Sequence, residues 1–180
     1  MRLTRYSSHV SLSSHARHVG LSGTGVAQQP PFHAPSHHTM ENAMHAQEII
    51  GSHPHVKANT NDALIRCVEE CYDCAQACTA CADACLGEKS VDSLTQCIRL
   101  NLDCADICAA TGPIGSRRTG SNEGVLIAVL QACAAACRAC GEECAKHANH
   151  HEHCKVCADS CQRCAQACDD AVSSIQVTSH

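Results

Sequence analysis

Eighteen cysteines lie between Cys67 and Cys168, and most follow one another at steps of three or four residues. Residues three and four apart share one face of an α-helix, so these cysteines form stripes of thiols along helices. The stripes are Cys67, Cys71, Cys74, Cys78, Cys81 and Cys85; Cys97, Cys104 and Cys108; Cys133, Cys137, Cys140 and Cys144; and Cys154, Cys157, Cys161, Cys164 and Cys168. Because thiolates bind soft metal ions, the spacing predicts a helical protein with a thiol-lined, metal-binding core.

The spacing of the thiols favours Cu(I) over the other metals that thiolates bind. Structural zinc sites take isolated sets of four ligands, and iron–sulfur motifs place their cysteines on loops around a cluster. Here the cysteines run continuously through helices. Cysteines four apart, such as Cys67 and Cys71, have β-carbons about 5–6 Å apart, so both sulfurs can turn toward one small ion. Many Cu(I) ions could therefore line up along the stripes.

Other uses of cysteine fit this sequence less well. A disulfide scaffold is typical of short, loop-rich secreted chains, whereas these cysteines lie in helices. A CxxC oxidoreductase would need a surrounding βαβ pattern, which the sequence does not have. A zinc-buffering or redox-active protein that resembles metallothionein in its role remains the alternative to copper binding. We expect a binding protein and not an enzyme.

Caps and helix breakers delimit the helices that carry the stripes. Thr60, Asn61 and Asp62 include good N-cap residues, Gly87 is a typical C-terminal glycine, and Ser121 can cap a further helix. The predicted helices span about 41–51, 60–86, 91–112, 121–148 and 154–174, with Gly112-Pro113 as the stop of the third. Four long helices with short connections predict an all-α, antiparallel up-down-up-down four-helix bundle preceded by a short helix.

Residues 1–40 differ in composition from the rest of the chain. They are rich in Ser, His, Gly and Pro and have no helical period, so we expect a disordered N-terminal extension, or a reading frame that in fact starts at Met40. The bundle domain is expected over residues 41–176. The extension carries a charge of +3 and the remainder −8, which argues against a nucleic acid partner. We also find no signal-peptide core and expect no membrane span.

Three segments give the chain a specific resemblance: CVEECYDCAQACTACADAC, CIRLNLDCADIC and ECAKHANHHEHCKVCADSCQRCAQAC. They resemble the bacterial four-helix-bundle copper storage proteins, in particular the cytosolic branch, over about residues 40–176. The resemblance implies a cytoplasmic protein that forms a homotetramer of bundles and stores many Cu(I) ions on inward-facing thiolates. All eighteen cysteines fall on such stripes here.

The two ends of the predicted bundle differ in chemistry. Continuing the third stripe beyond Cys144 by three residues reaches His147, and continuing the fourth stripe back from Cys154 by four reaches His150. His151 and His153 lie beside them. We therefore predict His147 and His150 as additional copper ligands at a mouth, since imidazole is a copper ligand that holds less firmly than a thiolate. The opposite end is predicted to be an apolar plug that contains Leu64, Ile127, Leu130, Val172 and Ile175.

Overall fold

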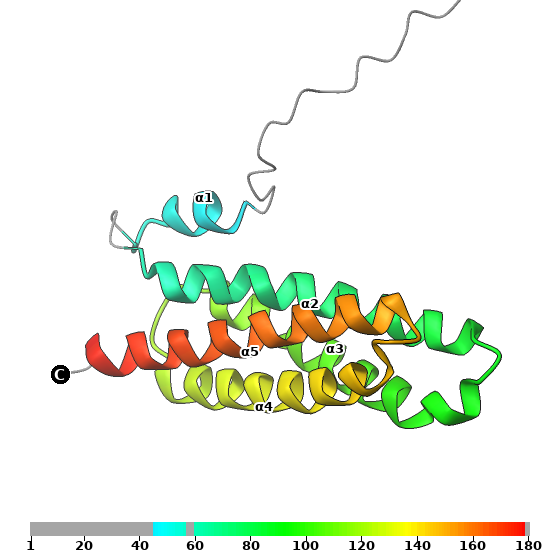
Figure 1. Cartoon of the computed structure of the whole chain (residues 1–180). Coiled ribbons are helices and arrows are strands. Elements are labelled where there is room, and N and C mark those ends of the chain that lie inside the picture. The colour runs from blue at the N-terminus through cyan, green and yellow to red at the C-terminus, as the bar shows by residue number, and fades with distance from the viewer. Residues whose placement is uncertain (1–44, 57–59, 179–180) are drawn as a thin grey trace, which may run out of the picture. The chain divides into compact units, whose positions relative to one another are not determined.

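The computed structural model describes residues 45–56 and 60–178, and within these ranges it contains helices and no strand (Figure 1). The elements are α1 (Ala46–Gly51), α2 (Asp62–Gly87), the 3₁₀ turn η1 (Val91–Leu94), α3 (Thr95–Ser116), α4 (Glu123–His147) and α5 (Glu152–Thr178). The predicted short helix over 41–51 thus begins at Ala46. The predicted disordered extension, residues 1–40, lies outside the described residues.

The four long helices form an antiparallel bundle in which consecutive helices are neighbours. α2 packs against α3 and α5, and α4 packs against the same two helices from the other side (Figure 1). Short connections allow this arrangement, because they can only join helices that lie side by side and run in opposite directions. The prediction of an all-α, up-down-up-down bundle is confirmed.

Local capping explains where α2 begins and ends. The side chain of Asn61 accepts a hydrogen bond from the backbone N–H of Leu64 at 3.0 Å, which satisfies one of the free donors of the first turn. Gly87 is the last helical residue, as predicted, and Glu88 follows in an extended conformation. The start of α4 differs from the prediction. Asn122 and not Ser121 precedes the helix, and the Asn122 side chain makes no capping hydrogen bond.

The predicted stop of α3 at Gly112-Pro113 is wrong, because the helix continues to Ser116. Packing against α2 explains the continuation. A β-carbon on Gly112 would lie 3.0 Å from the Tyr72 ring, and one on Gly115 would lie 2.9 Å from a methyl group of Val68. The two glycines therefore let the last turns of α3 approach α2 closely, and this contact outweighs the helix-breaking tendency of Pro113.

Thiols fill most of the bundle core, since all eighteen cysteines are at most 2% exposed. Large apolar side chains are few and lie mainly near the ends. Leu64, Leu130 and Ile175 are buried at the end where α2 and α4 begin, as predicted for the plug, while Ile127 and Val172 are partly buried there. At the other end, the fully buried Leu94 of η1 packs into the same cluster.

A small second cluster attaches α1 to the bundle. Ile50 and Val56 pack against Ile65 and Val68 of α2. These contacts bury apolar side chains that α1 alone could not bury, which is why so short a helix is stable. Among the described residues, one helix, α4, is long and apolar enough to cross a membrane by length and composition alone. This is weak evidence, since core helices of soluble proteins meet the same criterion.

Candidate metal centre

The thiols form one network that connects all four long helices. Every cysteine is free and buried. Within α2, the sulfurs of Cys74 and Cys78 are 3.8 Å apart. Across helices, the Cys74 sulfur lies 3.8 Å from that of Cys137 in α4 and 3.7 Å from that of Cys161 in α5. The Cys74 sulfur therefore has neighbours on its own helix and on two others at distances that one small ion could bridge with little movement.

Several groups of four residues in this network are close enough to bind one metal ion. The ligand atoms of each group lie within 4.8 Å of one another. Sets made only of cysteines include Cys71, Cys133, Cys164 and Cys168; Cys74, Cys108, Cys137 and Cys164; Cys74, Cys78, Cys104 and Cys161; and Cys78, Cys140, Cys157 and Cys161. Neighbouring sets overlap, because Cys164, Cys74, Cys78 and Cys161 each belong to two of them. The arrangement suits ions that share bridging thiolates more than isolated ions with four private ligands.

Asn101 interrupts the thiol stripe of α3. It is fully buried, and its amide nitrogen donates to the sulfurs of Cys97 and Cys144 at 3.4 and 3.3 Å. Its amide oxygen accepts from the Cys157 thiol at 3.0 Å and the Cys140 thiol at 3.5 Å. The cysteine pattern did not indicate this residue, although position 101 lies four residues after one cysteine and three before the next. It therefore continues the stripe with an amide in place of a thiol.

A histidine completes a further ligand set at the opposite end from the apolar plug. The His153 Nδ1 atom lies 3.4 Å from the Cys81 sulfur and 3.5 Å from the Cys154 sulfur, and these three residues form a set with Cys85. His153 was noted in the sequence only as a neighbour of the two predicted ligands. Its contact with Cys81 joins residues 72 positions apart, so the spacing within one stripe could not reveal it.

The two predicted histidine ligands lie at the same end but differ in their surroundings. His147 ends α4 and is partly buried, with its Nε2 atom 3.5 Å from a Glu143 carboxylate oxygen. His150 lies exposed in the turn between α4 and α5, and its side chain makes no hydrogen bond or ion pair within the described residues. The structure thus places His147 beside the thiol core and His150 on the outer surface of the turn.

Burial keeps thiols near this end protonated before a metal binds. Loss of hydration raises the pKa of Cys85 to about 11, and burial also raises the pKa of Cys154. Because the thiolate is the metal ligand, an ion that binds here must displace protons. Binding is therefore coupled to proton release and weakens as the pH falls.

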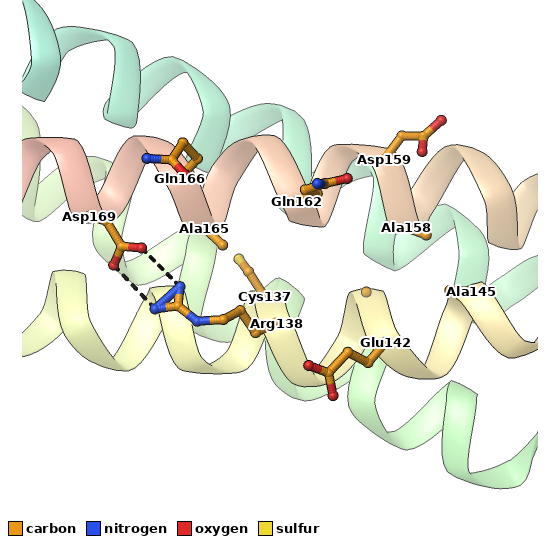
Figure 2. Close-up of a pocket in the computed structure, with 11 residues that line it drawn as sticks. Cys137, Arg138, Glu142, Ala145, Ala158, Asp159, Gln162, Ala165, Gln166 and Asp169 are labelled. Carbon is orange, nitrogen blue, oxygen red and sulfur yellow. Dashed lines mark hydrogen bonds and ion pairs between the residues drawn. The ribbon is translucent and has the colours of Figure 1, made fainter.

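An outer groove between α4 and α5 is lined largely by polar side chains and not by thiols. It has a volume of about 470 Å³, and the Arg138 guanidinium spans it to the Asp169 carboxylate at 3.1 and 3.2 Å (Figure 2). Polar side chains such as Gln162 and Gln166 line it, and Cys137 is its only thiol. The groove lies on the outer side of the bundle and meets the thiol network only at Cys137, so it is not part of the candidate metal centre.

Comparisons with known proteins agree with this geometry. The copper storage protein family model matches residues 60–173. The structure of the copper storage protein Ccsp from Streptomyces lividans, loaded with 10 copper equivalents, is 52% identical, with a TM-score of 0.69, and the match covers 71% of this chain and 98% of that one. A five-copper structure of the cytosolic copper storage protein from the same organism is 59% identical, with a TM-score of 0.61 and coverage of 62% and 93%.

A more distant match is also a copper storage protein. The Cu(I)-bound protein BsCsp3 from Bacillus subtilis is 39% identical, with a TM-score of 0.51, and the match covers 57% of this chain and 92% of that one. A comparison with curated proteins finds no match. The matched family model spans most of the bundle and all eighteen cysteines. The chain belongs to the copper storage protein family.

Proposed function

We infer that this chain stores many Cu(I) ions on the thiolates that line its bundle core. The observation that carries this function is the overlap of the four-thiol sets, because shared thiolates let a row of ions fill the core. All eighteen cysteines are proposed as ligands. Family membership agrees with this function, and the Streptomyces lividans relative holds 10 copper equivalents.

The same observations bear on catalysis, on the location of the protein and on its partners. We propose that it acts in storage and not in catalysis, since the buried core holds ligands and is closed to larger molecules. Its location is proposed to be cytoplasmic, as in the relative described as cytosolic. A homotetramer follows from the family resemblance, and copper ions are its proposed partners, with no nucleic acid and no membrane.

Zinc buffering is the alternative function, and a competition between the two metals distinguishes them. We expect Cu(I) to displace zinc completely from zinc-loaded protein, because two or three sulfurs suffice for Cu(I) whereas zinc needs a tetrahedral set of four. Reduced protein would be loaded with zinc under anaerobic conditions and titrated with Cu(I), while a chromogenic indicator reports the zinc released. Retention of zinc in the presence of excess Cu(I) would contradict copper storage.

Copper is proposed to pass through the histidine end, where His147, His150 and His153 lie. Replacing His153 by Ala is expected to slow Cu(I) uptake from a chelator complex by about tenfold, equivalent to about 1.4 kcal/mol of barrier height. The reason is the contact of its Nδ1 atom with the sulfurs of Cys81 and Cys154. The double variant H147A/H150A is expected to slow uptake as well. Capacity should change little, because the thiolates store the ions.

Stopped-flow spectroscopy would measure these uptake rates. His55 provides the matched control, because it is an exposed histidine that precedes α2, far along the chain from the histidine end. The variant H55A is expected to load at the wild-type rate. Wild-type rates in both H153A and H147A/H150A would show that copper enters elsewhere.

A further inference from the structure

Three side chains without sulfur meet beyond the thiol core, where α2 ends and α5 begins. The Oε1 atom of Glu88 lies 3.1 Å from the Nδ1 atom of His151 and 3.5 Å from the Nε2 atom of His153. The centroids of the two imidazole rings are 5.4 Å apart. All three side chains are partly exposed, whereas the cysteines are buried. The group therefore differs from the thiol sets in its donor atoms and in its contact with solvent.

Backbone hydrogen bonds at the two helix ends hold this group in place. Glu88 directly follows α2, and its N–H donates to the Cys85 carbonyl at 3.3 Å. His151 directly precedes α5, and its carbonyl accepts from the N–H of Cys154 at 3.1 Å. His153 lies in the first turn of α5. Because α2 and α5 pack against each other, the group is built on the ends of two helices that support one another.

The Nε2 atom of His153 is buried and has no hydrogen-bond partner among the described residues. A buried polar atom without a partner is costly, and in native structures such an atom often marks the place of a water molecule or an ion. The Nδ1 atom on the other side of the ring lies 3.4 Å from the Cys81 sulfur. The ring therefore meets the thiol core with one nitrogen and leaves the other nitrogen beside Glu88 without a partner.

The distances around the Glu88 oxygen fit a shared metal ion. Zinc binds histidine nitrogens at about 2.0–2.1 Å and carboxylate oxygens at about 2.0–2.2 Å in a tetrahedron, so its ligand atoms lie about 3.3–3.4 Å from one another. The distances of 3.1 and 3.5 Å fall on either side of this value. Two imidazoles and one carboxylate suit a divalent ion of this kind more than Cu(I), which prefers thiolates. The partial exposure of the group leaves room for water as a fourth ligand.

We propose that Glu88, His151 and His153 form a second metal site, which binds one divalent ion such as zinc outside the thiol core. The ion is held by Nδ1 of His151, Nε2 of His153 and a carboxylate oxygen of Glu88. A neutral imidazole has one nitrogen with a free lone pair, so an ion on Nε2 leaves the proton of His153 on Nδ1. There the proton can be donated to the Cys81 sulfur.

This site goes beyond copper storage and is compatible with it. Two or three sulfurs suffice for Cu(I), so the thiolates next to His153 keep their copper while the ring binds the divalent ion. Three protein ligands at a partly exposed position hold that ion less firmly than the thiol core would. A chelating indicator therefore removes it, and the zinc competition described above still ends in complete release.

Cobalt(II) tests the site, because it takes the same ligands as zinc and its visible and X-ray absorption spectra report which ligands it has. The full chain would be saturated with Cu(I) under anaerobic conditions, so that the thiolates are occupied, and then titrated with Co(II). We expect a Co(II) ion bound by nitrogen and oxygen atoms. No bound Co(II), or a ligand shell that contains sulfur, would overturn the proposal.

Variants identify the ligands of the bound ion. E88A is expected to weaken Co(II) binding by at least about tenfold, since even the loss of an outer partner of a metal site costs about 10–100-fold in affinity. H151A is expected to weaken it as well. E88Q keeps the shape of the side chain without its charge, so an intermediate affinity is expected, and it serves if E88A does not fold. Ions bound by other histidines would persist in E88A, so an unchanged affinity in E88A or E88Q would refute the site.

A matched variant separates coordination from charge. Glu142 is an exposed acidic residue near the C-terminal end of α4, so E142A removes the same charge from the same end of the bundle. E142A is expected to bind Co(II) as the wild type does, and an equal loss in E142A and E88A would overturn the role of Glu88 as a ligand. The copper content of the same samples tests storage separately. A low content would refute storage alone, whereas a normal content without bound Co(II) would refute this site alone.

Discussion

Anaerobic titration of the reduced protein is expected to saturate at more than nine Cu(I) ions per chain. Eighteen thiols used in private pairs would hold nine ions. The structure does not arrange them in private pairs, because residues such as Cys78 and Cys161 belong to two ligand sets each. Shared thiolates bridge neighbouring ions and so raise the number that the core can hold. Native mass spectrometry of the loaded protein would give the count directly.

Single variants test whether the thiolates are shared. If every ion used two private cysteines, C78S would lose one ion. Because Cys78 contributes to two sets, we expect C78S to lose more than one ion. The variant C85S is the control and is expected to lose one ion, since Cys85 falls in the terminal set with Cys81, Cys154 and His153. Saturation of the wild-type protein at four or fewer ions would indicate a few discrete sites and would exclude storage.

Cu(I) loading is expected to raise the unfolding temperature of the protein by more than about 10 °C. The metal-free core has few large apolar side chains, and cysteine and alanine occupy most of it. Each independent site adds about 2.7 kcal/mol when free ligand is a hundredfold above its dissociation constant. One kcal/mol shifts the midpoint of a domain of this size by roughly 2–8 °C, so a few filled sites suffice.

Circular dichroism at rising temperature, with metal-free and loaded samples in the same reductant and chelator, would measure this shift. The unfolded chain keeps its cysteines and can bind some Cu(I), which reduces the gain but does not cancel it, because the unfolded chain does not hold the thiols of four helices together. An unchanged midpoint would mean that the ions bind outside the folded core.

The periodicity of the cysteines was sufficient to predict the helices, their faces and the bundle. Local signals for helix ends were less reliable wherever tertiary packing competed with them. Asn61 caps α2 as its residue type predicts, and its amide also donates to the Ser174 hydroxyl of α5 at 2.9 Å, so here the tertiary contact supports the local signal. Gly112 and Pro113 look like a helix stop in sequence, yet the approach of Tyr72 to Gly112 makes continuation of α3 favourable. Such a contact between residues 40 positions apart cannot be read from a single segment.

The candidate site was predictable where it follows one helix and not where it crosses between helices. His147 lies where the stripe of α4 continues, and it is partly buried as expected. The extension back from Cys154 to His150 assumed a helix that does not exist there, since α5 begins at Glu152. The turn instead leaves His150 exposed and brings His153 to Cys81. The role of His150 as a copper ligand, like the roles of the other predicted site residues, stays a prediction.

The close approach of free thiols has a consequence for the chemistry of the cell that contains the protein. Neighbouring sulfurs lie 3.4–4.0 Å apart, for example 3.4 Å between Cys67 and Cys168. An oxidant that removes two electrons and two protons from such a pair leaves a disulfide and eliminates two ligands at once. The capacity of the empty protein is therefore set by the redox balance around it, and bound copper protects the sulfurs that hold it.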